Sequence, residues 1–230
     1  MSGTGLAIFV KTPSLSPVKT RLSERMGQRC AETFHLASAE AVASVAVQAQ
    51  ADVDMTVYWA VAEPEAMRSE VWSDLPKLAQ GPGSLGSRMA AVHRRLLEIH
   101  RAEILIGADA PQVTADRLMR AVHWLDAAEP RLVIGRARDG GFWIFGSNVF
   151  VPDSTWTGVC YSAPDTARDF IDAARRYGTW LELDPLDDVD TFDDFAPALH
   201  AIEGLSQPTD AQRRLGRWMT EVIQREGRCP

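Results

Sequence analysis

Cysteine is scarce in this sequence, which has three cysteines in 230 residues. Cys30, Cys160 and Cys229 lie far apart and have none of the spacings that ligate zinc. We therefore expect neither a disulfide framework nor a zinc site. Free thiols are typical of proteins in a reducing compartment.

Long hydrophobic runs are also absent. No stretch approaches the roughly 18 apolar residues of a membrane span, and the N-terminus lacks the charged and apolar regions of a signal peptide. The net charge of −7 disfavours general binding to nucleic acid or acidic membranes. We expect a cytoplasmic enzyme that acts on small molecules, with no nucleic-acid partner and no membrane partner.

The composition is that of an ordinary globular protein. The chain is 46% hydrophobic and 24% charged, and it contains no low-complexity tract, linker or internal repeat. A chain of this length can bury a substantial core. We therefore expect one domain over residues 1–230.

A short apolar segment with an acid at its end stands at residues 103–111, EILIGADAP. Residues 104–106 predict a strand that is covered on both faces, as in the centre of a parallel sheet. The carboxyl end of such a strand lies where open α/β sheets bind ligands, so Asp109 is a candidate functional acid. Asp109 equally suits a cap for a helix that begins near Thr114.

The first strand is predicted over residues 5–10 and leads into the segment KTPSLSPVKTRL at 11–22. Its prolines and serines predict a loop that neither continues the strand nor yet begins a helix. Lys11, Lys19 and Arg21 are cations on this loop that could pair with phosphate oxygens. The alternative is a solvated charged loop.

Strands and helices alternate through the rest of the chain, which predicts an α/β fold with a doubly wound, mostly parallel sheet. The pattern indicates helices at 27–50, 64–72, 114–127, 164–177 and about 208–226, and strands at 55–61, 132–134, 142–146 and 179–184. The last of these strands is expected at an edge of the sheet.

A glycine-rich segment, GPGSLGSRM at residues 81–89, precedes another predicted helix. Glycines such as Gly83 let backbone N–H groups approach an anion at a helix N-terminus, and Arg88 adds positive charge there. A structural cap explains the same pattern.

The segment RDGG at residues 138–141 lies between two predicted strands. Two glycines after an acid suit a hairpin turn. The same residues could bind a ligand, because Gly140 and Gly141 allow close backbone approach and Asp139 can accept a hydrogen bond from a hydroxyl group or amine.

An acidic segment occupies residues 184–194, DPLDDVDTFDD, and leads into a helix near Thr191. Some of its acids must cap that helix, but capping needs fewer acids than are present. Magnesium is typically held by one or two carboxylates together with phosphate oxygens and water. Asp109 and one acid of this segment would make such a site. The six acids are Asp184, Asp187, Asp188, Asp190, Asp193 and Asp194.

Five segments in this order resemble the motifs of the rSAM/selenodomain-associated transferase 1, or cofC-like glycosyltransferase, family: VKTPSLSPVKTRL, GPGSLGSRM, IGADAP, RDGGFWIFG and DDVDTFDDF. That family belongs to the nucleotide-diphospho-sugar transferase superfamily. The resemblance covers roughly residues 5–200. It implies the GT-A fold, a single-domain three-layer sandwich, with a bound nucleotide and Mg²⁺ (or Mn²⁺).

The resemblance also implies roles for individual residues. Lys19, Arg21 and Arg88 match family positions that bind the nucleotide and its phosphates, and Lys11 and Gly83 are further candidates for this role from their own segments. The remaining candidates are Asp109 and Asp139 as catalytic acids, Gly140 and Gly141 on the acceptor side, and Asp109 with Asp190 as the metal ligands. We expect the last two acids to be close in space, or else Asp190 only caps the helix after it.

The chain departs from the family pattern at three places. Ser16 and Pro17 stand where the family usually has Gly, Ser84 stands where it usually has Asp, and Ala108 removes a full Asp-x-Asp sequence. Ser16, Pro17 and Ser84 bear on the geometry of the nucleotide-binding loop and on activity, and Ala108 leaves a single acid as the local metal signal.

We therefore expect a metal-dependent transferase that uses a nucleotide-activated substrate, with glycosyl transfer from a nucleotide sugar as the leading hypothesis. Nucleotidyl transfer from a nucleoside triphosphate is the alternative, and it suits the cationic loop. A catalytically degenerate nucleotide-binding protein is the third possibility. The sequence leaves open the small-molecule acceptor, the nucleobase and the oligomeric state.

Overall fold

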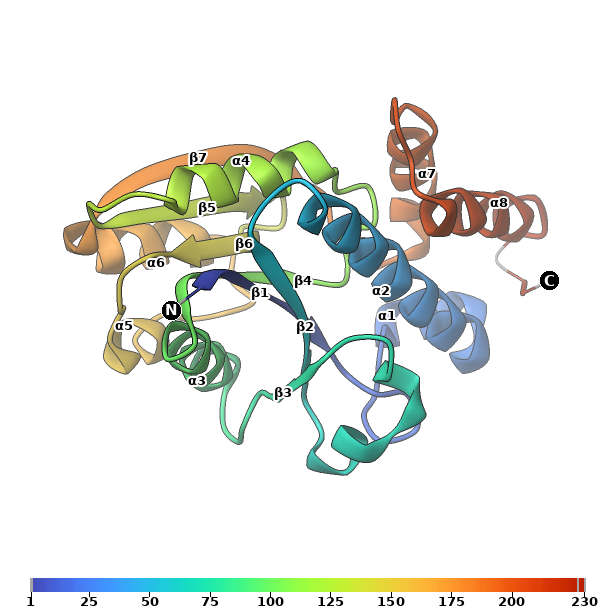
Figure 1. Cartoon of the computed structure of the whole chain (residues 1–230). Coiled ribbons are helices and arrows are strands. Elements are labelled where there is room, and N and C mark those ends of the chain that lie inside the picture. The colour runs from blue at the N-terminus through green and yellow to red at the C-terminus, as the bar shows by residue number, and fades with distance from the viewer. Residues whose placement is uncertain (1, 227, 230) are drawn as a thin grey trace.

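A seven-stranded sheet forms the centre of the computed structural model, which describes residues 2–226, 228 and 229 (Figure 1). The strand order is β3-β2-β1-β4-β6-β5-β7, and β6 alone runs antiparallel to its neighbours. The strands are β1 (Ser2–Val10), β2 (Met55–Val61), β3 (Lys77–Ala79), β4 (His100–Gly107), β5 (Arg131–Ala137), β6 (Phe142–Ser147) and β7 (Thr179–Leu186).

Helices cover both faces of this sheet. Helices α2 and α4 pack on one face, and α3, α5 and α6 pack on the other. A third core lies beside the sheet, where α7 and α8 pack on α1 and the first half of α2 (Figure 1). The helices are α1 (Thr20–Met26), α2 (Gln28–Gln50), α3 (Leu85–Leu97), α4 (Ala115–Leu125), α5 (Asp153–Thr157), α6 (Thr166–Ala174), α7 (Phe195–Glu203) and α8 (Asp210–Gln224).

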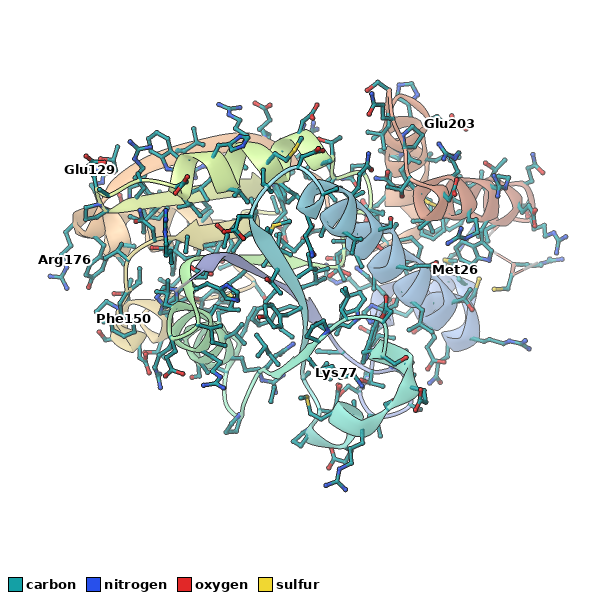
Figure 2. All side chains as sticks on the ribbon, viewed as in Figure 1. Met26, Lys77, Glu129, Phe150, Arg176 and Glu203 are labelled. Atoms are coloured by element: carbon teal, nitrogen blue, oxygen red, sulfur yellow. The ribbon has the colours of Figure 1, made fainter. Side chains whose placement is uncertain are left out.

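This arrangement confirms the predicted fold class, a three-layer α/β sandwich around a mostly parallel sheet. Residues 104–106 are fully or almost fully buried on both faces of β4, as the apolar run predicted. Side chains fill the space between the sheet and the helices on either side (Figure 2). Within the described residues, no helix is long and apolar enough to cross a membrane.

Several boundaries differ from those that the pattern predicted. The segment 11–22 was expected to be loop throughout, but α1 already begins at Thr20. The helix expected over 64–72 is two short 3-10 helices, η1 (Pro64–Arg68) and η2 (Glu70–Trp72), because Ser69 between them is extended. Strand β3 and helix α5 were not predicted; both are too short to show a clear period.

All the parallel strands end at the same edge of the sheet. Strand β1 pairs in parallel with both β2 and β4, and the β5–β6 hairpin turns at this edge too. The segments that follow these strands, and that carry the sequence motifs, therefore meet along one edge. This is where open α/β sheets bind ligands.

A buried acid lies on β4, away from that edge. Glu103 and His93 of α3 are both 0% exposed, and Glu103 Oε1 lies 2.9 Å from His93 Nδ1. The Val151 N–H donates to His93 Nε2, so the imidazole is neutral and its proton is on Nδ1. Glu103 therefore has no charged partner, and burial, partly opposed by His93, raises its pKa.

We predict that Glu103→Gln stabilises the protein at neutral and alkaline pH. Because the pKa of Glu103 is raised in the folded state, burying this group costs the wild type no stability below its ordinary pKa of 4.5. The free energy of unfolding then falls as the pH rises from there through the raised pKa. The amide oxygen keeps the bond from His93 and carries no charge. Differential scanning calorimetry should show a gain in Tm that grows as the pH is raised above 4.5; a gain independent of pH would contradict this.

Candidate functional site

A cavity of about 580 Å³ opens at the carboxyl edge of the sheet. The ends of β1 and β4 form its floor, the start of α1 and the segment after β7 form one wall, and the starts of α3 and β6 form the other. One wall is charged and carries Lys19, Asp109 and Asp190. The floor and the opposite wall are largely apolar and include Phe9, Leu85, Met89, Leu105 and Phe142.

The ammonium group of Lys19 is the centre of the charged wall. It lies 2.8 Å from Asp109 Oδ1 and 3.0 Å from Asp190 Oδ1, and it donates to the Val189 carbonyl oxygen at 2.6 Å. The Lys19 side chain is only 5% exposed. An ammonium group has three N–H donors, so these three oxygens use all of them. The solvated-loop interpretation is therefore wrong for Lys19.

The pKa values in this cluster reflect the ion pairs. Burial opposes ionisation of Lys19, but the two carboxylates outweigh burial and raise its pKa. Burial likewise works to raise the pKa of Asp109, but the Lys19 ammonium more than offsets it and lowers that pKa. Both groups are therefore held in their charged forms.

The structure brings Asp109 and Asp190 together, as the doubly wound arrangement predicted. Neither acid acts as a helix cap. The side chain of Thr114 caps α4, and Thr191 with Asp194 forms a capping box at η4 (Phe192–Asp194). The carboxylates of both candidate metal ligands instead face Lys19.

Three further predicted cations line the same cavity: Lys11, Arg21 and Arg88. Arg21 is 73% exposed and stands 3.9 Å from Asp190 Oδ2, and Arg88 donates from Nε to the Gly83 carbonyl oxygen. Gly83 is not among the described residues that line the cavity. The cap interpretation of its segment is confirmed, because Ser84 Oγ accepts the Ser87 N–H at the start of α3.

The hairpin residues 138–141 are placed differently. Asp139 Oδ1 accepts the Gly141 N–H at 2.9 Å, and Gly140 has a φ of 98° that favours glycine. This confirms the hairpin turn. In the described part of the chain, Asp139, Gly140 and Gly141 are not among the cavity-lining residues. Their catalytic and acceptor roles stay predictions.

Asp188, one of the six acids of the acidic segment that were candidate partners for Asp109, also lines the cavity. Asp188 and Asp190 face the cavity, and Val189 between them is fully buried. Side chains alternate in this way along an extended segment. Burial and the neighbouring charge of Asp109 raise the pKa of Asp188 to about 7. The period of two in the letters DVD places Asp188 and Asp190 on the same side of this segment.

Buried side chains anchor the chain where β1 leaves the sheet. The Glu63 carboxylate accepts the Thr12 N–H, and Trp72 Nε1–H donates to Thr12 Oγ1. His35 Nε2–H donates to the Lys11 carbonyl, and Gln80 donates to the Val10 carbonyl. No pattern in the sequence indicates this set, because its members are scattered over α2, the β2–β3 connection and the position after β3.

The middle of the chain, residues 41–163, matches the family model described as "Uncharacterized protein conserved in bacteria (DUF2064)". The match covers more than half of the chain, so the protein belongs to this family. No curated protein matches the chain.

Solved structures share the fold at low sequence identity. A protein from Desulfovibrio desulfuricans G20, proposed to be a nucleotide-diphospho-sugar transferase, is 22% identical with a TM-score of 0.82, and the match covers 100% of both chains. CMP:2-keto-3-deoxy-manno-octonic acid synthetase complexed with CTP is 13% identical over 88% of this chain and 100% of the other, with a TM-score of 0.52. 4-Diphosphocytidyl-2C-methyl-D-erythritol synthase from Anaerococcus prevotii DSM 20548 is 7% identical over 87% and 98%, with a TM-score of 0.52. The chain therefore has the fold of nucleotide-diphospho-sugar transferases and cytidylyltransferases.

We predict that Lys19→Met destabilises the protein at neutral pH by about 1 to 2 kcal/mol, because two carboxylates lose their partner. This loss of stability is smaller than the loss expected for a fully buried ion pair, because the Asp109 and Asp190 side chains are 40% and 42% exposed and water screens their charges. Lys19 lowers the pKa of Asp109, so this stability is present above the ordinary pKa of 3.8 and is lost as pH falls through the lowered value. Urea unfolding at about pH 7 and pH 3 measures both effects.

Arg21→Met is the matched control, because it removes an exposed cation from the same wall. We expect its effect to be about 0.5 kcal/mol or less at either pH. Equal losses for the two variants at neutral pH would show that the Lys19 cluster does not stabilise the fold.

Proposed function

We propose that the protein is a cytoplasmic, metal-dependent transferase that takes a nucleotide-activated substrate, with a nucleotide sugar as the glycosyl donor. The observation that carries this proposal is the convergence of Asp109 and Asp190 on one cation inside a cavity that three further cations line. The likeness of the whole chain to the Desulfovibrio desulfuricans G20 structure supports it. The finer resemblance to the rSAM/selenodomain-associated transferase 1 family is part of the proposal.

The acidic wall suits a hard divalent cation. Asp109, Asp188 and Asp190 face the same cavity, and Lys19 is buried beside Asp109 and Asp190 as their counter-charge. Among the described residues, no three His, Cys, Asp or Glu side chains are arranged to hold a metal by themselves. Mg²⁺ or Mn²⁺ held by Asp109 and Asp190 would therefore take its other ligands from phosphate and water. When bound, the cation would neutralise charge on the diphosphate.

Side chains of the cavity and of the β5–β6 hairpin would bind the substrate and accept a proton. Lys11, Arg21 and Arg88 would attract the phosphates, and the apolar wall would hold the flat or less polar parts of the substrate. In glycosyl transfer, the acceptor oxygen bonds to the anomeric carbon while the bond to the diphosphate oxygen breaks, and the nucleoside diphosphate leaves. Asp139 would take the acceptor's proton, which requires its carboxylate to turn away from the Gly141 N–H.

Nucleotidyl transfer is the second candidate, and a specific observation favours it. Four cations, counting Lys19, line the cavity, a number that suits a triphosphate. The synthetase that contains CTP has the same fold. In this reaction an acceptor phosphate would bond to the α-phosphorus, and pyrophosphate would leave.

The departures from the family pattern are structurally accommodated, which argues against a degenerate protein. Ser84 caps α3, a position where serine and aspartate serve equally well. The turn before Pro17 is closed, because the Thr12 carbonyl accepts the N–H groups of Leu15 and Ser16. Pro17 itself lines the cavity.

A thermal-shift panel of sugar nucleotides and nucleoside triphosphates, each with and without Mg²⁺, tests the proposal. A ligand at 100 times its Kd stabilises by about 2.7 kcal/mol, on the order of 5 °C or more for a chain of this size. We expect the largest magnesium-dependent shift from a sugar nucleotide. A larger shift from a triphosphate would select nucleotidyl transfer, and no shift from any nucleotide would refute both.

We further predict that Asp109→Asn removes the magnesium-dependent part of the shift, because it removes a charged metal ligand while the side chain lies partly exposed at a strand end. The folded protein should retain its circular dichroism spectrum. Asp193→Asn, an exposed acid of the same acidic segment, is the control and should leave the shift unchanged. An unchanged shift in Asp109→Asn would exclude its metal role.

A further inference from the structure

The loop that carries Asp109 is buried, which is uncommon for a connection between elements. Residues 108, 110, 111, 112 and 113 are all buried between β4 and α4. A buried loop must find hydrogen-bond partners for its backbone carbonyls, because water does not reach them. The donors to these carbonyls therefore determine where the loop lies.

The donors come from four different parts of the chain. Ser38 Oγ of α2 donates to the Ala108 carbonyl at 2.6 Å, and the Val189 N–H donates to the Asp109 carbonyl at 2.9 Å. The Val113 N–H donates to the Ala110 carbonyl within the loop. Two further carbonyls, of Pro111 and Val113, both accept from one side chain of α8: Gln212 Nε2, at 2.8 and 2.9 Å.

Gln212 is fixed in this orientation. It is 1% exposed, and its Oε1 accepts the Thr209 N–H at 3.0 Å, within the capping box of α8. Only the amide orientation with Nε2 toward the loop satisfies all three bonds, because a carbonyl oxygen cannot donate. Thr209 Oγ1 in turn lies 2.7 Å from Ser44 Oγ, which ties the same end of α8 to α2.

We propose that Gln212 is a positioning residue for the cation site, and that the C-terminal helix α8 serves the site through it. This inference rests on the proposed function. Gln212 holds residues 111–113, and Gln112 Nε2 donates from there to the Asp187 carbonyl at 2.6 Å. The loop is thus joined to the acidic segment at two points, on either side of Asp188. Gln212 thereby sets the distance between Asp109 and Asp190.

Gln212→Met removes both donors and keeps an unbranched side chain of similar length. Thr209→Ala is the matched control: it weakens the same cap of the same helix but leaves Gln212 in place. Gln224→Met is the second control, since Gln224 is exposed near the other end of α8. These variants separate loss of the loop contact from loss of helix stability.

Two measurements decide the matter. Hydrogen exchange in the peptide over residues 104–114 should become faster in Gln212→Met and stay near wild type in both controls. The concentration of Mn²⁺ at half-saturation, measured by electron paramagnetic resonance with inorganic pyrophosphate present to supply phosphate ligands, should rise about tenfold in Gln212→Met only, as for other residues that support metal ligands.

Equal exchange in Gln212→Met and Thr209→Ala, or an unchanged Mn²⁺ half-saturation in Gln212→Met, would overturn the positioning role. A wild-type protein that takes up no Mn²⁺ in the presence of pyrophosphate would instead refute the proposed cation site. The exchange pattern alone would then decide whether Gln212 holds the loop.

Discussion

The ion cluster of Lys19, Asp109 and Asp190 is the interaction on which the rest of the site depends. It joins the start of α1, the end of β4 and the segment after β7, which are far apart in the sequence. A buried ammonium group costs free energy unless oxygens satisfy all its N–H groups, and three oxygens do so here. The cluster therefore forms only when all three segments are correctly placed, and so it couples the fold to the site.

The sheet topology supplies this placement. Parallel strands end at one edge, so the segments after β1, β4 and β7 meet without any special contact between the strands themselves. Buried side chains then fix each segment in detail: Glu63 and Trp72 hold the exit from β1, and Gln212 holds the exit from β4. The acids and cations of the cavity can be partly exposed, because buried residues outside the cavity hold their segments in place.

The sequence predicted the sheet elements well and the contacts poorly. Periodicity identified β1, β2 and β4, and the strand-end rule placed Asp109 at the ligand edge. The sequence could not show that the Lys19 side chain turns toward the two acids. That orientation depends on the left-handed backbone of Lys19, whose φ is 45°. Nor could the sequence identify Gln212, since a polar residue on an amphipathic helix resembles any solvated one until the loop that it contacts is placed.

The central claim is that Asp109 and Asp190 share one divalent cation beside a bound nucleotide. Anomalous diffraction from a crystal grown with Mn²⁺ and the nucleotide that stabilises the protein most tests it directly. We expect a manganese peak within about 2.2 Å of a carboxylate oxygen of each acid, with Lys19 released from at least one of them toward the phosphates. A manganese peak away from these acids, or a bound nucleotide with Lys19 still paired to both, would contradict it.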